Sequence, residues 1–219
     1  MSDSRVIVSN QAGLHESLDD VVRKHLTHPF QKPFAEHTVS EFERLNEIVQ
    51  ASSRPLILDS CCGVGESTAN LAARHPDALV IGLDKSAHRI NKHVDNYQGE
   101  DGEYLLARVD LNDFWRLALD AGWRPTHHYL LYPNPWPKSK HLQRRWHGAA
   151  VFPTLVALGG KLELRSNWPV YLQEFQRALE IAGHNSQFGP LAQQPALTPF
   201  ERKYAASGQP LYQLVAELG

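Results

Sequence analysis

The stretch from 133 to 145 holds the side chains of this sequence that are most able to do chemistry. It reads Pro-Asn-Pro-Trp-Pro-Lys-Ser-Lys-His-Leu-Gln-Arg-Arg. The amide of Asn134 can accept a hydrogen bond at a reacting group, the indole of Trp136 can stack on an aromatic ligand, and the cations that follow can bind phosphates. Those cations are Lys138, Lys140, His141, Arg144 and Arg145. The pattern predicts a binding loop beside a reaction centre; the simpler alternative is a solvated basic loop with Trp136 packed into the core.

A strand must position this loop. The apolar run 129–132 predicts a short buried strand, and Pro133 ends it because proline has no N–H for a sheet ladder. Three earlier apolar runs, at 55–59, 78–84 and 105–110, end in Asp59, Asp84 and Asp110. Open α/β sheets bind ligands at the carboxyl ends of their strands, so we expect the acids and the loop to meet at one edge of the sheet.

The acids and the glycine turn after the first of them predict a ligand built from a ribose, an adenine and a charged tail. Asp84 is placed to accept hydrogen bonds from both ribose hydroxyls, and Asp110 from the adenine amino group. Gly63 and Gly65 let the backbone approach a ligand without a Cβ in the way. A dinucleotide or S-adenosylmethionine would fit, but the third glycine of the dinucleotide fingerprint is missing, which favours S-adenosylmethionine.

Helical periodicity surrounds these strands. Helices are predicted at 18–26, 38–50, 66–74, 86–96, 111–121, 146–158 and 169–182, further strands at 161–165 and 211–218, and a loop at 188–198. Strands that alternate with helices imply a mainly parallel sheet covered on both faces. We expect residues 1–50 to form an amino-terminal arm and helices that pack on the core, and residues 51–219 to form the main α/β domain.

The composition is that of an ordinary globular protein. Hydrophobic residues make up 42% and charged residues 21% of the 219 positions, and the formal net charge is −2, so any contact with nucleic acid must come from a local patch. Cys61 and Cys62 are adjacent and cannot form a disulfide framework, and no Cys/His spacing predicts a zinc site. No apolar run is long enough for a membrane span and no signal peptide is evident, so we expect a cytoplasmic protein.

Separate segments resemble one enzyme family. Leu58-Asp59-x-x-Cys62-Gly63-x-Gly65 resembles motif I of class I S-adenosylmethionine-dependent methyltransferases, with Cys61 in place of the usual first glycine. The stretch 133–145 strongly resembles the Pro-Asp-Pro-Trp-x-Lys-x-Arg-His-x-x-Arg-Arg signature of bacterial tRNA (guanine-N7)-methyltransferases. Segments 166–171 and 198–201 are similar to that family's Thr-Asp-Trp-x-x-Tyr and Thr-x-Phe-Glu elements. The resemblance covers roughly residues 55 to 215 and implies a Rossmann-like class I methyltransferase fold with a mainly parallel seven-stranded sheet and helices on both faces.

The resemblance also implies roles for individual residues. The implied cofactor is S-adenosylmethionine, contacted by Asp59, Cys61, Gly63, Gly65, Asp84, Lys85, Asp110, Leu111 and Asn134. Asn134 lies beside the methyl group and is the predicted catalytic residue. The target guanine is expected to be surrounded by Lys138, Asn167, Thr198, Phe200 and Glu201, and the RNA backbone to be met by Lys140, His141, Arg144 and Arg145. The implied partner is tRNA, without a membrane or a metal, and we expect a monomer or homodimer.

Two departures bear on activity, because Asn134 and Asn167 stand where the family carries aspartates. Guanine N7 has a free lone pair, so its methylation needs positioning and charge stabilisation rather than a general base. Each asparagine still accepts a hydrogen bond but loses its charge-assisted part, on the order of 1 kcal/mol or more. Two alternatives stay open. One is a changed specificity for an exocyclic amine, since Asn134-Pro-Trp partly resembles the Asn-Pro-Pro-aromatic motif of amine methyltransferases; the other is a non-catalytic protein that binds cofactor or RNA.

Overall fold

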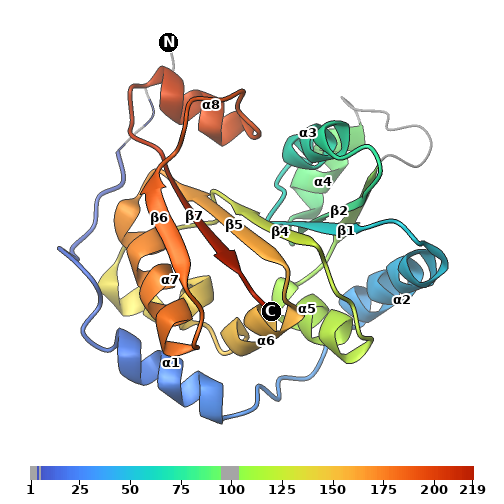
Figure 1. Cartoon of the computed structure of the whole chain (residues 1–219), viewed down its shortest axis with the longest axis horizontal. Helices are drawn as coiled ribbons and strands as arrows, with labels where there is room; N and C mark the ends of the chain where they lie inside the picture. The colour runs from blue at the N-terminus through green and yellow to red at the C-terminus, as the bar shows by residue number, and fades with distance from the viewer. Residues whose placement is uncertain (1–3, 5, 95–103) are drawn as a thin grey trace.

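The computed structural model describes residues 4, 6–94 and 104–219. Its centre is a seven-stranded sheet in the order β3-β2-β1-β4-β5-β7-β6 (Figure 1). The strands are β1 Leu56–Ser60, β2 Leu79–Asp84, β3 Tyr104–Arg108, β4 His127–Leu131, β5 Lys161–Ser166, β6 Ser186–Pro190 and β7 Tyr212–Glu217. Strands β1 to β5 are parallel, whereas β7 runs antiparallel to β5 and β6. This arrangement confirms the predicted class I methyltransferase fold.

Helices connect the strands. They are α1 Leu18–Thr27, α2 Glu36–Ala51, α3 Glu66–Arg74, α4 Ala87–Val94, α5 Leu111–Asp120, α6 Phe152–Leu158, α7 Pro169–Ile181 and α8 Pro199–Ala206, with short 3-10 turns at η1 Ser139–Arg144 and η2 Trp146–Gly148. From β1 the chain steps outward through α3 and α4, and from β3 it returns through α5 to β4 on the other side of β1. Because such crossovers are right-handed, the outward and returning helices cover opposite faces of the sheet.

The central strands are continuous apolar runs because both of their faces are covered. Every residue of β1 and of β2 is buried, whereas the edge strands β3 and β6 are only partly buried. Phe42 of α2 packs against Phe114 of α5 with ring centroids 5.6 Å apart, and Leu18 and Val22 of α1 join the same core. The amino-terminal helices therefore share the hydrophobic core of the sheet domain. Across the described ranges, no helix is long and apolar enough to cross a bilayer.

Two predicted elements differ from the structure. The helix predicted at 146–158 begins only at Phe152, because Gly148 packs against the backbone of Leu142 and Pro153 favours the first turn of a new helix. The loop predicted at 188–198 overlaps β6, whose Gly189 and Pro190 are poor strand formers that the edge of a sheet tolerates. The helix predicted at 86–96 is described as far as Val94, and its last two positions lie outside the described residues.

Candidate active site

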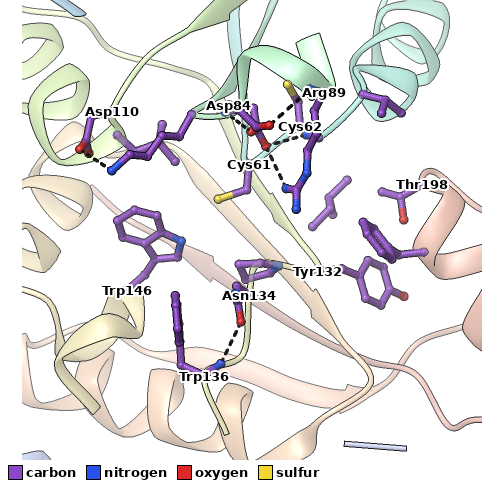
Figure 2. A pocket seen from close by; sticks show the side chains of 18 of the residues that line it. Cys61, Cys62, Asp84, Arg89, Asp110, Tyr132, Asn134, Trp136, Trp146 and Thr198 are labelled. Atoms are coloured by element: carbon purple, nitrogen blue, oxygen red, sulfur yellow. Dashed lines mark hydrogen bonds and ion pairs between the residues drawn. The ribbon is translucent and has the colours of Figure 1, made fainter. Parts of the chain in front are cut away.

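A cavity of about 920 Å³ opens at the carboxyl ends of the central strands (Figure 2). One end is formed by the turn after β1, the end of β2 and the start of α5, and the other by the loop after β4 and the start of α8. Of the residues predicted for the site, the wall includes Cys61, Gly63, Asp84, Lys85, Asp110, Leu111, Asn134, Arg144, Thr198 and Phe200. The fold thus brings the predicted cofactor acids and the reaction-centre amide into one space.

Three residues of the turn after β1 have a left-handed backbone conformation. Cys61, Gly63 and Gly65 have φ values of 68°, 64° and 81°. The left-handed conformation is unfavourable for Cys61, because its Cβ comes close to the backbone. At Gly63, nothing lies within 4 Å of the position that a Cβ would occupy. The turn therefore presents its backbone, rather than side chains, to the cavity at Gly63. Burial raises the pKa of the Cys61 thiol to about 12, which keeps it neutral.

Asp59 is a correction to the sequence prediction, because it does not line the cavity. It is fully buried behind the turn, where one carboxylate oxygen accepts hydrogen bonds from Ser67 Oγ at 2.6 Å and Thr68 Oγ1 at 2.7 Å. Burial outweighs these hydrogen bonds and raises the pKa of Asp59 to about 6. Its role is to tie the first turn of α3 to the end of β1, and Gly65 caps α3 beside it without reaching the wall.

Asp84 and Asp110 stand where the prediction put them. The Oδ2 of Asp84 accepts a hydrogen bond from the N–H of Gly63 at 3.0 Å, and its Oδ1 accepts from the N–H of Ser86 at 2.8 Å. Asp110 caps α5 through the N–H of Asn112 at 3.0 Å. Burial works against the charged form of Asp110, but hydrogen bonds from Asn112 and Lys85 prevail and lower its pKa. Both carboxylates are therefore fixed acceptors at one end of the cavity.

The loop after β4 turns sharply at the other end. Its backbone is left-handed at Tyr132 and Trp136, with φ values of 51° and 46°, and the side-chain oxygen of Asn134 accepts a hydrogen bond from the N–H of Trp136 at 3.3 Å. Trp136 is half-buried and lines the cavity, with the guanidinium of Arg144 4.8 Å from its ring centroid. Packing of Trp136 into the core is thereby excluded. Figure 2 shows Asn134 and Trp136 at the end of the cavity opposite Asp84 and Asp110, with the side-chain oxygen of Asn134 directed toward the backbone of Trp136.

Arg145 is a second correction, because its side chain cannot meet an RNA backbone. It is fully buried, and its guanidinium pairs with Glu174 of α7 at 2.5 Å. It also donates to the carbonyl oxygens of Trp136 at 3.1 Å and Lys138 at 3.3 Å. Lys138 and Lys140 are exposed and His141 is half-buried, all outside the cavity. Within the basic stretch, Arg145 therefore holds the loop from inside the protein, whereas Lys138 and Lys140 face solvent.

The residues predicted around the target base also divide. Thr198 and Phe200 line the cavity, but Glu201 is buried in an ion pair with Arg165 at 3.0 Å. Asn167 donates a hydrogen bond to the side chain of Gln209 at 2.8 Å and does not reach the wall. In this structure Glu201 and Asn167 therefore support the wall instead of forming it.

Other wall residues were missed by the sequence prediction. These are Cys62, Val64, Ser86, His88, Arg89, Lys92, Asn112, Leu131, Tyr132, Pro133, Gln143, Trp146, Ala149 and Pro199. The signal for the basic ones was present, because a helix that starts at Ala87 turns positions 88, 89 and 92 toward one side.

The amino-terminal arm lies along the loop. Ser9 Oγ donates to the carbonyl of Pro137 at 2.6 Å, and Asn10 accepts from the N–H of Ser139 at 3.0 Å. Gln11 contacts both members of the buried ion pair, accepting from Arg145 at 3.0 Å and donating to Glu174 at 2.5 Å. The segment that matched the family least thus supports the predicted reaction centre.

Comparisons of the sequence with known proteins point to one family. Residues 53–214 match the family Methyltransf_4, described as "Putative methyltransferase". The tRNA (guanine-N(7)-)-methyltransferase of Nocardioides sp. is 32% identical over 74% of this chain and 67% of its own length, and that of Alkalilimnicola ehrlichii is 30% identical over 73% and 71%. Among solved structures, the aminoglycoside resistance methyltransferase NpmB1 (TM-score 0.56, 18% identity, 81% of this chain and 93% of that one) and the 16S rRNA methyltransferase KamB (0.55, 18%, 86% and 96%) share the fold. The chain is therefore a diverged member of the methyltransferase family to which the bacterial tRNA (guanine-N7)-methyltransferases belong.

Proposed function

We propose that this protein binds S-adenosylmethionine in the cavity and transfers its methyl group to N7 of a guanine in tRNA. The observation that carries the proposal is that one continuous cavity joins the glycine turn and its two acids to Asn134 and Trp136. A surface with Lys138 and Lys140 lies next to this cavity. The curated relatives named as tRNA (guanine-N(7)-)-methyltransferases support the same activity.

The acids suit the cofactor. Asp84 retains acceptor capacity beyond its two backbone hydrogen bonds, which a ribose diol can use. Asp110 lines the same end and can accept from an adenine amino group. The open space at Gly63 admits a ligand close to the backbone. S-adenosylmethionine would supply an electrophilic methyl group on a sulfonium; the chain itself has to orient the acceptor and exclude competing positions.

The wall near Asn134 suits a neutral base whose nitrogen already carries a lone pair. Trp136 and Phe200 offer aromatic surfaces, and Thr198 offers a hydroxyl that also accepts from the N–H of Glu201 at 2.9 Å. Guanine N7 needs no proton removed before it attacks, so an amide in place of a carboxylate at 134 is compatible with turnover at a reduced rate.

An exocyclic amine is the second candidate acceptor. Among the described residues that line the cavity, the carboxylates are Asp84 and Asp110, both at the predicted cofactor end. The base end therefore lacks a carboxylate that would stabilise a cationic base, whereas the Asn134 oxygen could accept from an amino group. A protein that binds its ligands without turnover is the remaining alternative.

Transfer of labelled methyl to unmodified tRNA, followed by identification of the labelled nucleoside, tests these alternatives. We expect N7-methylguanosine, with Asn134→Asp at least as active as the parent because a carboxylate stabilises the developing charge. Gln50→Glu on α2, an exposed change from amide to carboxylate outside the cavity, is the matched control. Label in an adenine or cytosine nucleoside would show that the methyl acceptor is an exocyclic amine and not guanine N7. Cofactor binding without methyl transfer to any RNA would show that the protein is not an enzyme of this kind.

A further inference from the structure

Helix α4 forms a basic wall of the cavity that the site prediction did not use. His88, Arg89 and Lys92 all line the cavity and are exposed. Figure 2 shows the side chain of Arg89 extending from this helix into the cavity below Asp84. Arg144 reaches the same cavity from the loop after β4. Basic side chains thus enter it from two separate segments of the chain.

This basic character does not suit the cofactor. S-adenosylmethionine carries a sulfonium, an ammonium and one carboxylate, so its own net charge is positive and additional cations do not attract it. The chain as a whole has a formal charge of −2, so the concentration of cations at this cavity is local. A polyanion is the ligand that such a wall attracts, and the phosphates of RNA recur at every nucleotide.

The contact that holds Arg89 in place is weak. Its Nη1 lies 3.6 Å from Asp84 Oδ2, and the Arg89 side chain is 53% exposed. Exposed ion pairs of this kind contribute little. The hydrogen bonds that Asp84 accepts from the N–H groups of Gly63 and Ser86 are shorter, so a ribose that binds Asp84 would compete with Arg89 and not with the backbone.

We propose that the α4 wall, through Arg89 and Lys92, binds phosphates that flank the target nucleotide, and that cofactor at Asp84 releases Arg89 for this contact. The inference rests on the proposed function in taking RNA as the substrate. It makes RNA binding and cofactor binding mutually favourable, since each ligand takes one partner of the Arg89–Asp84 pair.

Binding of fluorescently labelled, unmodified tRNA, measured by anisotropy over a range of salt concentrations with and without S-adenosylhomocysteine, tests the proposal. We expect Lys92→Ala to weaken binding about five-fold and to reduce the slope of log Kd against log salt by about 1 under both conditions. Arg89→Ala should weaken binding more with S-adenosylhomocysteine than without it, so the enhancement by that ligand is reduced. Lys24→Ala on α1, which packs against α6 and α7, is the matched control and should match the parent.

The possible outcomes distinguish a failure of the α4 proposal from a failure of the proposed methyl transfer. Variants at both positions that keep the parent's affinity and salt slope would overturn the proposal, even with full methyl transfer by the parent. A fall in S-adenosylhomocysteine affinity in Arg89→Ala by calorimetry, with tRNA binding unchanged, would assign Arg89 to the cofactor and overturn it as well. If the parent protein transfers no methyl group but the variants bind tRNA more weakly than the parent, the α4 proposal would stand and the proposed methyl transfer would be wrong.

Discussion

The guanidinium of Arg145 and the carboxylate of Glu174 form a fully buried ion pair, with Nη1 2.5 Å from Oε2. His147 Nε2 lies 2.9 Å from the same carboxylate oxygen, and burial is outweighed by the neighbouring His147 and Arg145, so that the pKa of Glu174 falls to about 2. Since Arg145 also donates hydrogen bonds to the carbonyls of Trp136 and Lys138, the pair fixes the shape of the loop that carries Asn134. The pair is the anchor of this loop.

We expect Arg145→Ala to lower the free energy of unfolding by about 3–5 kcal/mol, because Glu174 would remain buried without its guanidinium partner. Urea unfolding followed by circular dichroism measures the change. Arg177→Ala, which removes ion pairs with Asp19 and Glu180 at the surface, is the control and should have a much smaller effect. An Arg145→Ala protein that keeps full stability but loses a tRNA phosphate contact would restore the RNA role predicted from the sequence.

Asp59 should leave a mark on the pH dependence of stability. Burial raises the pKa of Asp59 to about 6 in the folded protein from its ordinary value of 3.8, so the folded state binds the proton more tightly than the unfolded state. Asp59 therefore destabilises the fold above about pH 6, and this effect is lost as the pH falls toward about 4. The difference in unfolding free energy between Asp59→Asn and the parent should rise in favour of the variant from about pH 4 to about pH 7. A difference that does not change with pH would contradict the raised pKa.

Gly63→Ala should impair cofactor binding more than folding. The left-handed φ of 64° costs alanine about 1 kcal/mol, and the added methyl group enters the space where we expect the cofactor. We expect the affinity for S-adenosylhomocysteine, measured by calorimetry, to fall by about ten-fold or more. Gly183→Ala has a comparable φ of 88° and equally open surroundings but lies after α7, so it should show the folding cost with unchanged affinity. Equal affinities in the two variants would place the cofactor elsewhere.

Gln11→Ala should lower methyl transfer while sparing the cofactor. The change removes hydrogen bonds to Arg145 and Glu174 and so loosens the loop that carries Asn134. We expect a fall in kcat of about ten-fold, with the dissociation constant of S-adenosylhomocysteine unchanged. Asn10→Ala loses exposed contacts with Ser139 and should have a smaller effect. A Gln11→Ala enzyme with unchanged kcat would show that the arm does not influence the reaction centre.

The strands and their terminal acids were predictable because they depend on local pattern. Continuous apolar runs place β1 and β2 within a residue of their observed bounds. The turn after β1 was predictable from Gly63 and Gly65, whose backbones are left-handed in the structure. The division of the basic stretch was not predictable in this way. Arg144 and Arg145 are neighbours of the same type, yet one faces the cavity and the other is buried, because the partner of Arg145 lies 29 residues away on α7.

The same limit explains the other corrections. Glu201 pairs with Arg165 across 36 positions, and Asn167 with Gln209 across 42, so their removal from the wall depends on tertiary contacts. A family motif transfers the residue type and the neighbourhood but not the direction in which a side chain points. Strand β6 escaped prediction because pairing with β7, rather than its own propensity, makes it a strand.

The contact of Gln11 with Glu174 joins positions 163 residues apart. Val6 and Val8 of the arm are 72% and 85% exposed, so these hydrogen bonds and the half-buried Ile7, which packs against the core, hold the arm in this region. Closing so long a segment costs chain entropy and gives little in return until α7 has docked on the sheet. The loop that carries Asn134 should therefore reach its final shape late in folding, after the sheet that carries Asp84 and Asp110 is already formed.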